Sequence, residues 1–290
     1  MRIGTMSIIF REQLGTKEHI GYVECMERAK NAGFDVIDLN LCQICGHKTR
    51  LHLDSWQEEV EKIAEAKERL GISFPQCHLP FKSKKVKWET PEDYEYYTKM
   101  FYRAIDVAAE LKFPWAVVHP DRYFNVPGSE NWDLDKFIEE NHREYDPLVE
   151  YALKKGVGIA FENMNRGRFS QAEELVAYID SYHDDRIGAC WDTGHANMYY
   201  KGGDQWEPLH KVGHRLHATH VHDNNAKDDL HLLPFEGTID WPRVVAALKD
   251  IQYTGDFVSE AGCNFFTPDD MKDYTARHAH YVFERVLNND

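Results

Sequence analysis

The chain has 290 residues, with 34 Lys or Arg against 49 Asp or Glu, so its formal net charge is −15 with histidine neutral. Duplex binding depends mainly on basic side chains that neutralise phosphates, and this charge therefore argues against an unaided nucleic-acid binder. Hydrophobic residues make up 42% of the chain, which suffices for a large core and excludes intrinsic disorder or a fibrous fold.

The sequence favours a soluble cytoplasmic protein. It contains no run of about 18 apolar residues, and its first residues lack the apolar stretch of a signal peptide, so we expect no membrane partner. Six cysteines occur without the regular spacing of a disulfide framework, as expected for reduced thiols. The one dense basic segment contains Lys82, Lys84, Lys85 and Lys87, and we interpret it as a solvated loop.

Eight short apolar runs, each separated from the next by a helical pattern, are predicted as strands. They are Ile3–Ile9, Phe34–Leu41, Ile72–His78, Trp115–His119, Val157–Glu162, Ile187–Asp192, Leu216–His222 and Asp256–Glu260. Dividing 290 residues by eight gives about 36, the size of one βα repeat with its loops. We therefore predict an α/β protein with a single-domain (β/α)8 TIM barrel over residues 1–290, and a doubly wound sheet as the alternative.

Two apolar stripes at helical spacing predict helix faces turned toward the core. The first comprises Trp56, Val60, Ile63 and Leu70. The second, in the last helix, comprises Met271, Tyr274, His278, Tyr281 and Val282.

Six of the predicted strands end on a side chain that can bind a metal or transfer a proton. These residues are His78, His119, Glu162, Asp192, His220 and Glu260. In a barrel, the carboxyl ends of the strands converge on one mouth, where catalytic groups assemble. Carboxylates and imidazoles gathered there repel and desolvate one another unless a cation lies among them. A divalent metal cofactor is therefore predicted.

A set of four of these residues, which we call the metal quartet, combines three carboxylates with one imidazole. Its members are Glu162, Asp192, His220 and Glu260. Such a donor set suits Mn²⁺, Mg²⁺ or Co²⁺, or Zn²⁺ with added water ligands. His220 and His222 share one face of an alternating strand, and we expect only one of them to reach the metal.

Four segments resemble the xylose isomerase-like barrel superfamily, in strand order along the whole chain. They are FEN at 161–163, CWDTGHAN at 190–197, HATHVHDNNAKDDLHLLPFEGTIDW at 217–241 and SEAG at 259–262. The superfamily contains sugar-phosphate isomerases and epimerases, ketose 3-epimerases, inosose dehydratases and, further off, endonuclease IV. The combination of motifs is specific to the superfamily and not to one reaction.

The resemblance implies that the metal quartet binds one divalent ion, that Glu162 and Glu260 double as catalytic acid and base, and that His195 contacts substrate. A metal chelated by a sugar's carbonyl and neighbouring hydroxyl stabilises an enediolate while carboxylates move the adjacent proton. We therefore predict an isomerase or epimerase of a sugar, sugar phosphate or cyclitol, with a related dehydratase as an alternative. Further residues expected to contact this small carbohydrate are His78, His119, Arg166 and His231.

Two departures argue against a free-ketose 3-epimerase in particular. Those enzymes carry an arginine six residues after the histidine of the seventh strand, where this chain has Ala226. Their Pro-Gly-x-Gly turn reads Pro234-Phe235-Glu236-Gly237 here. Both differences fall in a loop expected to cover substrate, and neither affects the metal quartet.

Endonuclease IV offers a second hypothesis, a multinuclear zinc phosphodiesterase. This chain has matching residue types at all nine positions of that enzyme's ligands for three zinc ions. Beyond the metal quartet, the additional ligands would be His78, His119, His195, Asp229 and His231. The net charge of −15 and the lack of basic loops place this hypothesis second.

Other features are less specific. Cys42 and Cys45 have the spacing of a redox or zinc pair, but no second such pair exists, and we assign them a structural role. The loops that include residues 41–54 and 81–90 are expected to select the substrate. The oligomeric state is left open, a homo-oligomer included.

Overall fold

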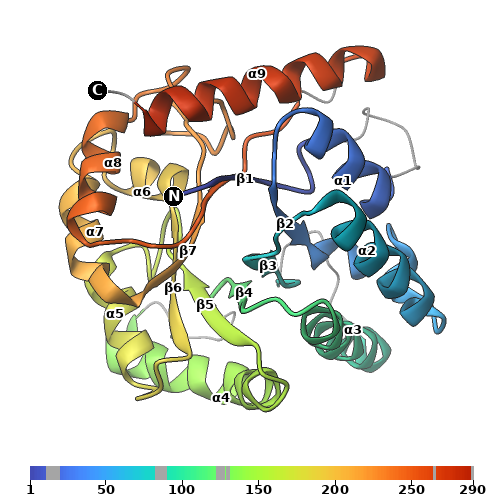
Figure 1. Ribbon diagram of the computed structural model, residues 1–290. Helices are drawn as coiled ribbons and strands as arrows, with labels where there is room; N and C mark the ends of the chain where they lie inside the picture. Colours follow the sequence, from blue (N-terminus) through green and yellow to red (C-terminus); the bar gives the residue numbers. More distant parts are fainter. Residues whose placement is uncertain (11–19, 82–89, 122–127, 129–130, 264–265, 289–290) are drawn as a thin grey trace.

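Eight parallel strands form one sheet in the computed structural model, which describes residues 1–10, 20–81, 90–121, 128, 131–263 and 266–288 (Figure 1). The predicted lysine cluster at 82–87 and most of the loop at 81–90 lie outside these residues. The strands are β1 Ile3–Met6, β2 Val36–Asn40, β3 Gln76–His78, β4 Trp115–Val118, β5 Gly158–Glu162, β6 Ile187–Asp192, β7 Leu216–His220 and β8 Phe257–Ser259.

The sheet closes into a barrel. Its strand order is β7-β6-β5-β4-β3-β2-β1-β8, and each neighbouring pair is parallel. The two edges meet just beyond the strand ends, where the Val221 N–H donates to the Val258 carbonyl at 2.8 Å and the Glu260 N–H to the Val221 carbonyl at 3.0 Å. The predicted barrel is thereby confirmed, and a doubly wound sheet is excluded because it would leave both edges open.

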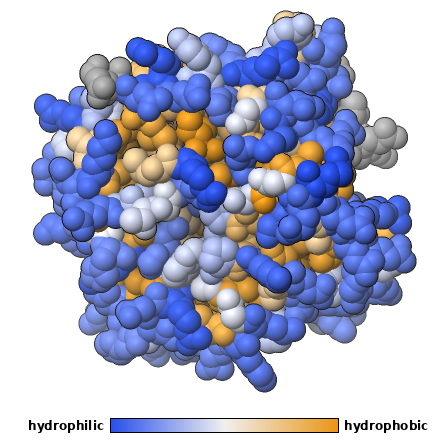
Figure 2. All heavy atoms as spheres, viewed as in Figure 1, coloured by the Kyte–Doolittle hydropathy of each residue, from blue (hydrophilic) through white to orange (hydrophobic). Residues whose placement is uncertain are grey.

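Helices surround the barrel and connect successive strands (Figure 1). They are α1 Tyr22–Asn31, α2 Trp56–Leu70, α3 Pro91–Glu110, α4 Leu134–Lys154, α5 Ala172–Asp180, α6 Thr193–Tyr199, α7 Trp206–Val212, α8 Trp241–Asp250 and α9 Asp269–Leu287, with short 3-10 turns η1 Leu41–Ile44, η2 Arg50–His52 and η4 Gly213–Arg215. In the described residues, no helix is long and apolar enough to cross a bilayer. Hydrophilic side chains cover most of the face seen in Figure 2.

The helix α9 packs with a different face from the one predicted. Tyr274 and Tyr281 are 70% and 59% exposed, whereas Ala279 and Phe283 are buried. The guanidinium of Arg28 in α1 binds Asp273 at 2.8 Å, so this side of α9 faces α1. The predicted apolar stripe is therefore wrong for α9, although the stripe in α2 is buried except for the half-buried Leu70.

Small side chains fill the barrel interior below the strand ends. Val117, Ala160, Cys190 and Ala218 form a buried cluster of their own. Side chains alternate along a strand, so the residues two positions further on also point inward. These residues are Glu162 after Ala160, Asp192 after Cys190, and His220 after Ala218. Because of this alternation, three members of the metal quartet lie directly above the buried apolar cluster.

Candidate functional site

The structure brings the metal quartet together at the carboxyl ends of four consecutive units. Glu162, Asp192 and His220 are the last residues of β5, β6 and β7, and Glu260 directly follows β8. One ligand atom from each of the four lies within 4.8 Å of the others. Glu162, Asp192 and His220 are at most 1% exposed, whereas Glu260 is half-buried and reaches the site from the mouth side.

Two buried atoms in this group have no hydrogen-bond partner. They are Oε2 of Glu162 and Nδ1 of His220, which lie 3.2 Å apart, and Oε2 of Glu260 is 3.6 Å from the same nitrogen. Leaving a buried polar atom unsatisfied costs roughly 1–3 kcal/mol, more for a charged group. A divalent cation that accepts lone pairs from the carboxylates and a neutral imidazole would satisfy both atoms, so the donor set fits such an ion.

His220 is supported from behind by Asp38 of β2. Nε2 of His220 lies 3.3 Å from Oδ2 of Asp38, and both side chains are fully buried. Gln76 of β3 donates to the same carboxylate oxygen at 2.8 Å. A carboxylate on one ring nitrogen holds that nitrogen protonated and leaves the other, here Nδ1, as the donor to a metal. Sequence reasoning missed Asp38, although a charged residue within a buried predicted strand was the available signal.

His78 and His119 form a second group that shares Glu162. Nε2 of His119 lies 3.1 Å from both Oε2 of Glu162 and Nε2 of His78, and the His78 nitrogen is 3.5 Å from the carboxylate. Phe81 stacks on the His119 ring with centroids 4.3 Å apart. Cys42, which is a free thiol, places Sγ 3.3 Å from Nδ1 of His78. The metal quartet and two of the predicted additional ligands, His78 and His119, therefore meet at the Glu162 carboxylate.

His195 connects this centre to the loop that follows β7. Its Nδ1 lies 3.2 Å from Oε1 of Glu162, and its Nε2 lies 3.5 Å from Oδ2 of Asp229. The same Asp229 oxygen is 3.6 Å from Nε2 of His231. Three residues singled out as additional ligands thus form a continuous chain with Glu162.

His222 also reaches the site, in a place distinct from that of His220. Its Nε2 lies 3.2 Å from Oδ1 of Asp192 and 3.7 Å from Oδ1 of Asp229. A β-carbon at Gly194 would lie 1.9 Å from the His222 ring, which explains why glycine occupies that motif position. Both histidines therefore belong to the candidate site. His220 lies in the metal quartet, and His222 contacts Asp192 and Asp229.

The buried Asp223 carboxylate organises the loop that carries Asp229 and His231. It accepts five hydrogen bonds. The donors are the backbone N–H groups of Asn224, Phe235, Thr238 and Ile239 and the indole Nε1 of Trp241, at 2.8 to 3.2 Å. Phe235 adopts a left-handed φ of 73°, so the phenylalanine replaces glycine at a position that favours glycine. Its side chain is 56% exposed.

Two carboxylates of the site, Glu162 and Asp192, are held ionised by their neighbours. Burial alone would raise the pKa of Glu162, but neighbouring histidines outweigh it, first of all through the positive charge of His220, and hold the pKa well below its usual range. At Asp192, burial is likewise outweighed, mainly by His195, and the pKa is lowered. Both groups are negative at neutral pH and attract a cation.

The pKa values of the histidines in the site are shifted in opposite directions by their surroundings. Burial lowers the pKa of His119 to about 4, so its ring is neutral and able to bind a metal. Burial also opposes protonation of His222, but Asp192 raises the pKa of that ring to about 9. The pKa values of His195 and His220 lie well above their usual range because nearby acids outweigh burial. Metal binding at these rings must therefore displace protons.

No hydrogen bond or ion pair within the described residues joins Arg166, predicted to contact substrate, to this centre. It is exposed on the loop after β5 and forms no ion pair within the described part of the chain. Cys45 is buried, which raises the pKa of its thiol to about 12, and no candidate ligand group among the described residues includes Cys42 or Cys45.

Phe161, next to Glu162, packs outward on Tyr178 with ring centroids 4.6 Å apart.

Comparisons with known proteins agree with this architecture. A family model described as a xylose isomerase-like TIM barrel matches residues 26–275. The uncharacterized protein y4fM of Sinorhizobium fredii is 36% identical over 169 residues, which cover 57% of this chain and about half, 51%, of that protein. A D-psicose 3-epimerase of Enterocloster bolteae is 23% identical over 258 residues, covering 84% of this chain and 78% of that enzyme. The crystal structure of a D-tagatose 3-epimerase-like protein superposes with a TM-score of 0.74 at 23% identity, covering 100% and 99% of the two chains.

Proposed function

Because this chain belongs to the xylose isomerase-like TIM barrel family, we propose that it is a metal-dependent isomerase that epimerises or isomerises a small carbohydrate. The reaction moves a proton on the carbon next to a carbonyl group. The observation that carries the proposal is the buried pair of unsatisfied atoms, Glu162 Oε2 and His220 Nδ1, within a set of three carboxylates and one imidazole. The similarity to D-psicose and D-tagatose 3-epimerases supports the same class of chemistry.

The metal quartet would hold one divalent ion, and that ion would supply the positive charge that polarises the sugar carbonyl. Glu162 and Glu260 then divide the proton transfer. For epimerisation, one carboxylate accepts the proton from carbon, and the other group, which enters the step protonated, gives its own proton to the opposite face. Aldose–ketose isomerisation needs only one such group, which carries the proton between adjacent carbons.

The remaining histidines of the centre orient the sugar. His195 lies between Glu162 and Asp229, and we assign it a contact with a substrate hydroxyl. His78, His119 and His231 would contact further hydroxyl groups. Because His119 is neutral and partly exposed, it can donate or accept a hydrogen bond at neutral pH.

Solvent exchange tests the proposal. The protein is incubated with Mn²⁺ and a panel of ketoses in deuterated water, and NMR follows deuterium at each carbon. We expect incorporation next to the carbonyl, and a fall of about 10²–10⁴-fold in Glu162→Gln and in Glu260→Gln. The control Glu65→Gln changes an exposed acid of α2 and should exchange normally. Near-normal turnover in both site variants would overturn the assignment.

The same assay separates related reactions. Epimerisation places deuterium at the inverted carbon without changing the sugar's constitution, whereas isomerisation places it at the former carbonyl carbon. A dehydratase would remove water, and mass spectrometry would detect a product lighter by one water molecule.

A multinuclear phosphodiesterase is the second candidate, and one observation favours it. Separate groups of possible ligands surround the quartet, namely His78 and His119 with Glu162, and Asp229 and His231 with His222. Metal analysis that finds about three zinc ions per chain, together with cleavage of an abasic duplex, would replace the carbohydrate proposal. The net charge of −15 argues against this outcome.

A further inference from the structure

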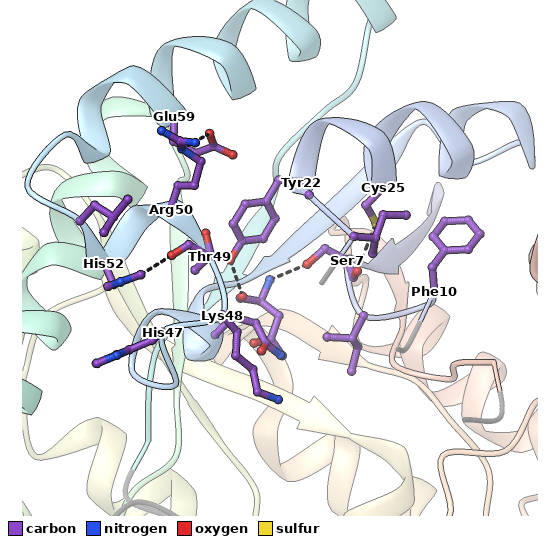
Figure 3. Close-up of a pocket in the computed structure, with 16 residues that line it drawn as sticks. Ser7, Phe10, Tyr22, Cys25, His47, Lys48, Thr49, Arg50, His52 and Glu59 are labelled. Carbon is purple, nitrogen blue, oxygen red and sulfur yellow. Dashed lines mark hydrogen bonds and ion pairs between the residues drawn. The ribbon is translucent and has the colours of Figure 1, made fainter. Parts of the chain in front are cut away.

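A cavity of about 620 Å³ lies at the carboxyl ends of β1 and β2 (Figure 3). Its lining includes Ser7, which follows β1, and Asn40, which ends β2. Two residues beyond Asn40, the Cys42 thiol contacts His78 of the centre. The cavity therefore adjoins the proposed reaction site on the side of β1 and β2, and its volume is typical of a small-ligand pocket.

The wall of the cavity is a fixed segment, residues 41–53. Asn40 accepts a hydrogen bond from the Cys42 N–H at 3.1 Å and so begins η1, and Thr49 accepts from the Leu51 N–H at 3.3 Å and begins η2. Arg103 of α3 donates to the carbonyls of Leu51 and Leu53, at 3.2 and 2.8 Å. Both turns are thus held in place, and the segment between them is anchored at both ends.

The charge of this wall is opposite to that of the whole protein. Lys48, Arg50, His47 and His52 line the cavity, together with one acid, Glu59. Arg50 approaches Glu59 only at 4.0 Å, and Lys62 lies at 4.0 Å from the same carboxylate oxygen. Lys48 is exposed and forms no ion pair within the described residues. One cation therefore faces the cavity unneutralised in a chain with 49 acidic residues.

We propose that this cavity binds the anionic end, a phosphate or carboxylate group, of a sugar whose carbonyl end lies at Glu162 and Glu260. The inference rests on the proposed function and names its substrate class, an acidic sugar. Lys48 supplies the main attraction as a compact charge, and Arg50 adds a second. A neutral sugar would gain nothing from the Lys48 charge, so the cavity favours an acidic sugar over a neutral one.

Binding of small probes tests the subsite without turnover. Calorimetry measures glycerol 3-phosphate, glycerate and glycerol on the full chain, once with Mn²⁺ and once with a chelator. We expect one of the two anions to bind under both conditions, and glycerol not to bind. Lys48→Gln should weaken the anion at least tenfold, whereas Lys249→Gln, which removes an exposed lysine of α8, should leave it unchanged. The tighter probe identifies phosphate or carboxylate as the recognised group.

Equal anion binding by the protein and Lys48→Gln, or no anion binding at all, would overturn the subsite. Loss of binding on chelation would place the anion at the metal centre and would overturn it as well. If the anion binds through Lys48 but no carbohydrate exchanges deuterium, the proposed function fails while the subsite stands. If an acidic sugar is turned over, Lys48→Gln should raise KM and leave kcat nearly unchanged, since Lys48 touches the substrate far from the reacting carbon.

Discussion

Nε2 of His220 lies 3.3 Å from Oδ2 of Asp38, although 182 residues separate the two in the chain. The contact turns the other ring nitrogen, Nδ1, toward Glu162 and Glu260. It therefore sets both the orientation and the protonation of the one imidazole in the metal quartet.

Replacing Asp38 should weaken metal binding. Asp38→Asn keeps the shape but removes the negative charge that stabilises the Nε2–H form of His220, and loss of such a supporting group typically costs 10–100-fold in metal affinity. Titration with Mn²⁺ followed by electron paramagnetic resonance measures this directly. Asp35→Asn is a matched control, because Asp35 lies near the same strand but pairs with Lys30 at the surface. Unchanged Mn²⁺ affinity in Asp38→Asn would contradict the role.

The stability of the metal-free protein should depend on His222 between about pH 6.5 and 9. The pKa of His222 rises from 6.5 to about 9 on folding, because Asp192 outweighs the effect of burial. Protonation therefore stabilises the folded state fully below pH 6.5, and this contribution is lost as the pH rises through 9. A shift of about 2.5 units corresponds to about 3 kcal/mol.

Urea unfolding in the presence of a chelator measures this effect. The protein should lose about 3 kcal/mol relative to His222→Asn when the pH is raised from 6 to 10. Parallel stability profiles for the two proteins would show that His222 does not titrate with the raised pKa.

Removing the charge of Asp223 should loosen the loop that carries Asp229 and His231. Asp223→Asn retains one acceptor oxygen but cannot satisfy five donors, and each hydrogen bond to a charged group contributes about 1.5–3 kcal/mol. We expect a loss of about 3 kcal/mol in the free energy of unfolding. Asp228→Asn, an exposed position in the same loop, should change it by less than about 0.5 kcal/mol. Similar losses in both variants would refute this account.

The orientation of α9 can be tested with two aromatic residues. Phe283 is fully buried, with its ring centroid 6.1 Å from that of Phe257, so Phe283→Ala should cost about 3–5 kcal/mol. Tyr281 is 59% exposed, and Tyr281→Ala should change stability by less than about 0.5 kcal/mol. Thermal unfolding of both variants measures the two losses of stability. A larger loss for Tyr281→Ala than for Phe283→Ala would support the buried face predicted from the apolar stripe.

Local sequence signals were sufficient for the barrel and for most of the site. Eight apolar runs at regular spacing predicted the strands, since a buried parallel strand leaves the same local pattern wherever it occurs. Polar residues at the carboxyl ends of those runs predicted the centre, because strand ends of a barrel share one mouth. The sequence predicted the exact ends of the strands less accurately. His119 and Glu260 fall just beyond β4 and β8, where hydrogen bonding to the neighbouring strand stops.

The sequence by itself therefore determined the order of the elements, the side of the barrel that carries chemistry, and the residue types gathered there. Only the tertiary structure decided that Asp38 supports His220, that His222 faces Asp192, and that α9 buries Phe283 while exposing Tyr281. Periodicity shows which side chains share a face of one element. It carries no information on which distant element that face meets, because such contacts depend on closure of the sheet and on pairs such as Arg28 with Asp273 that lie far apart in the chain.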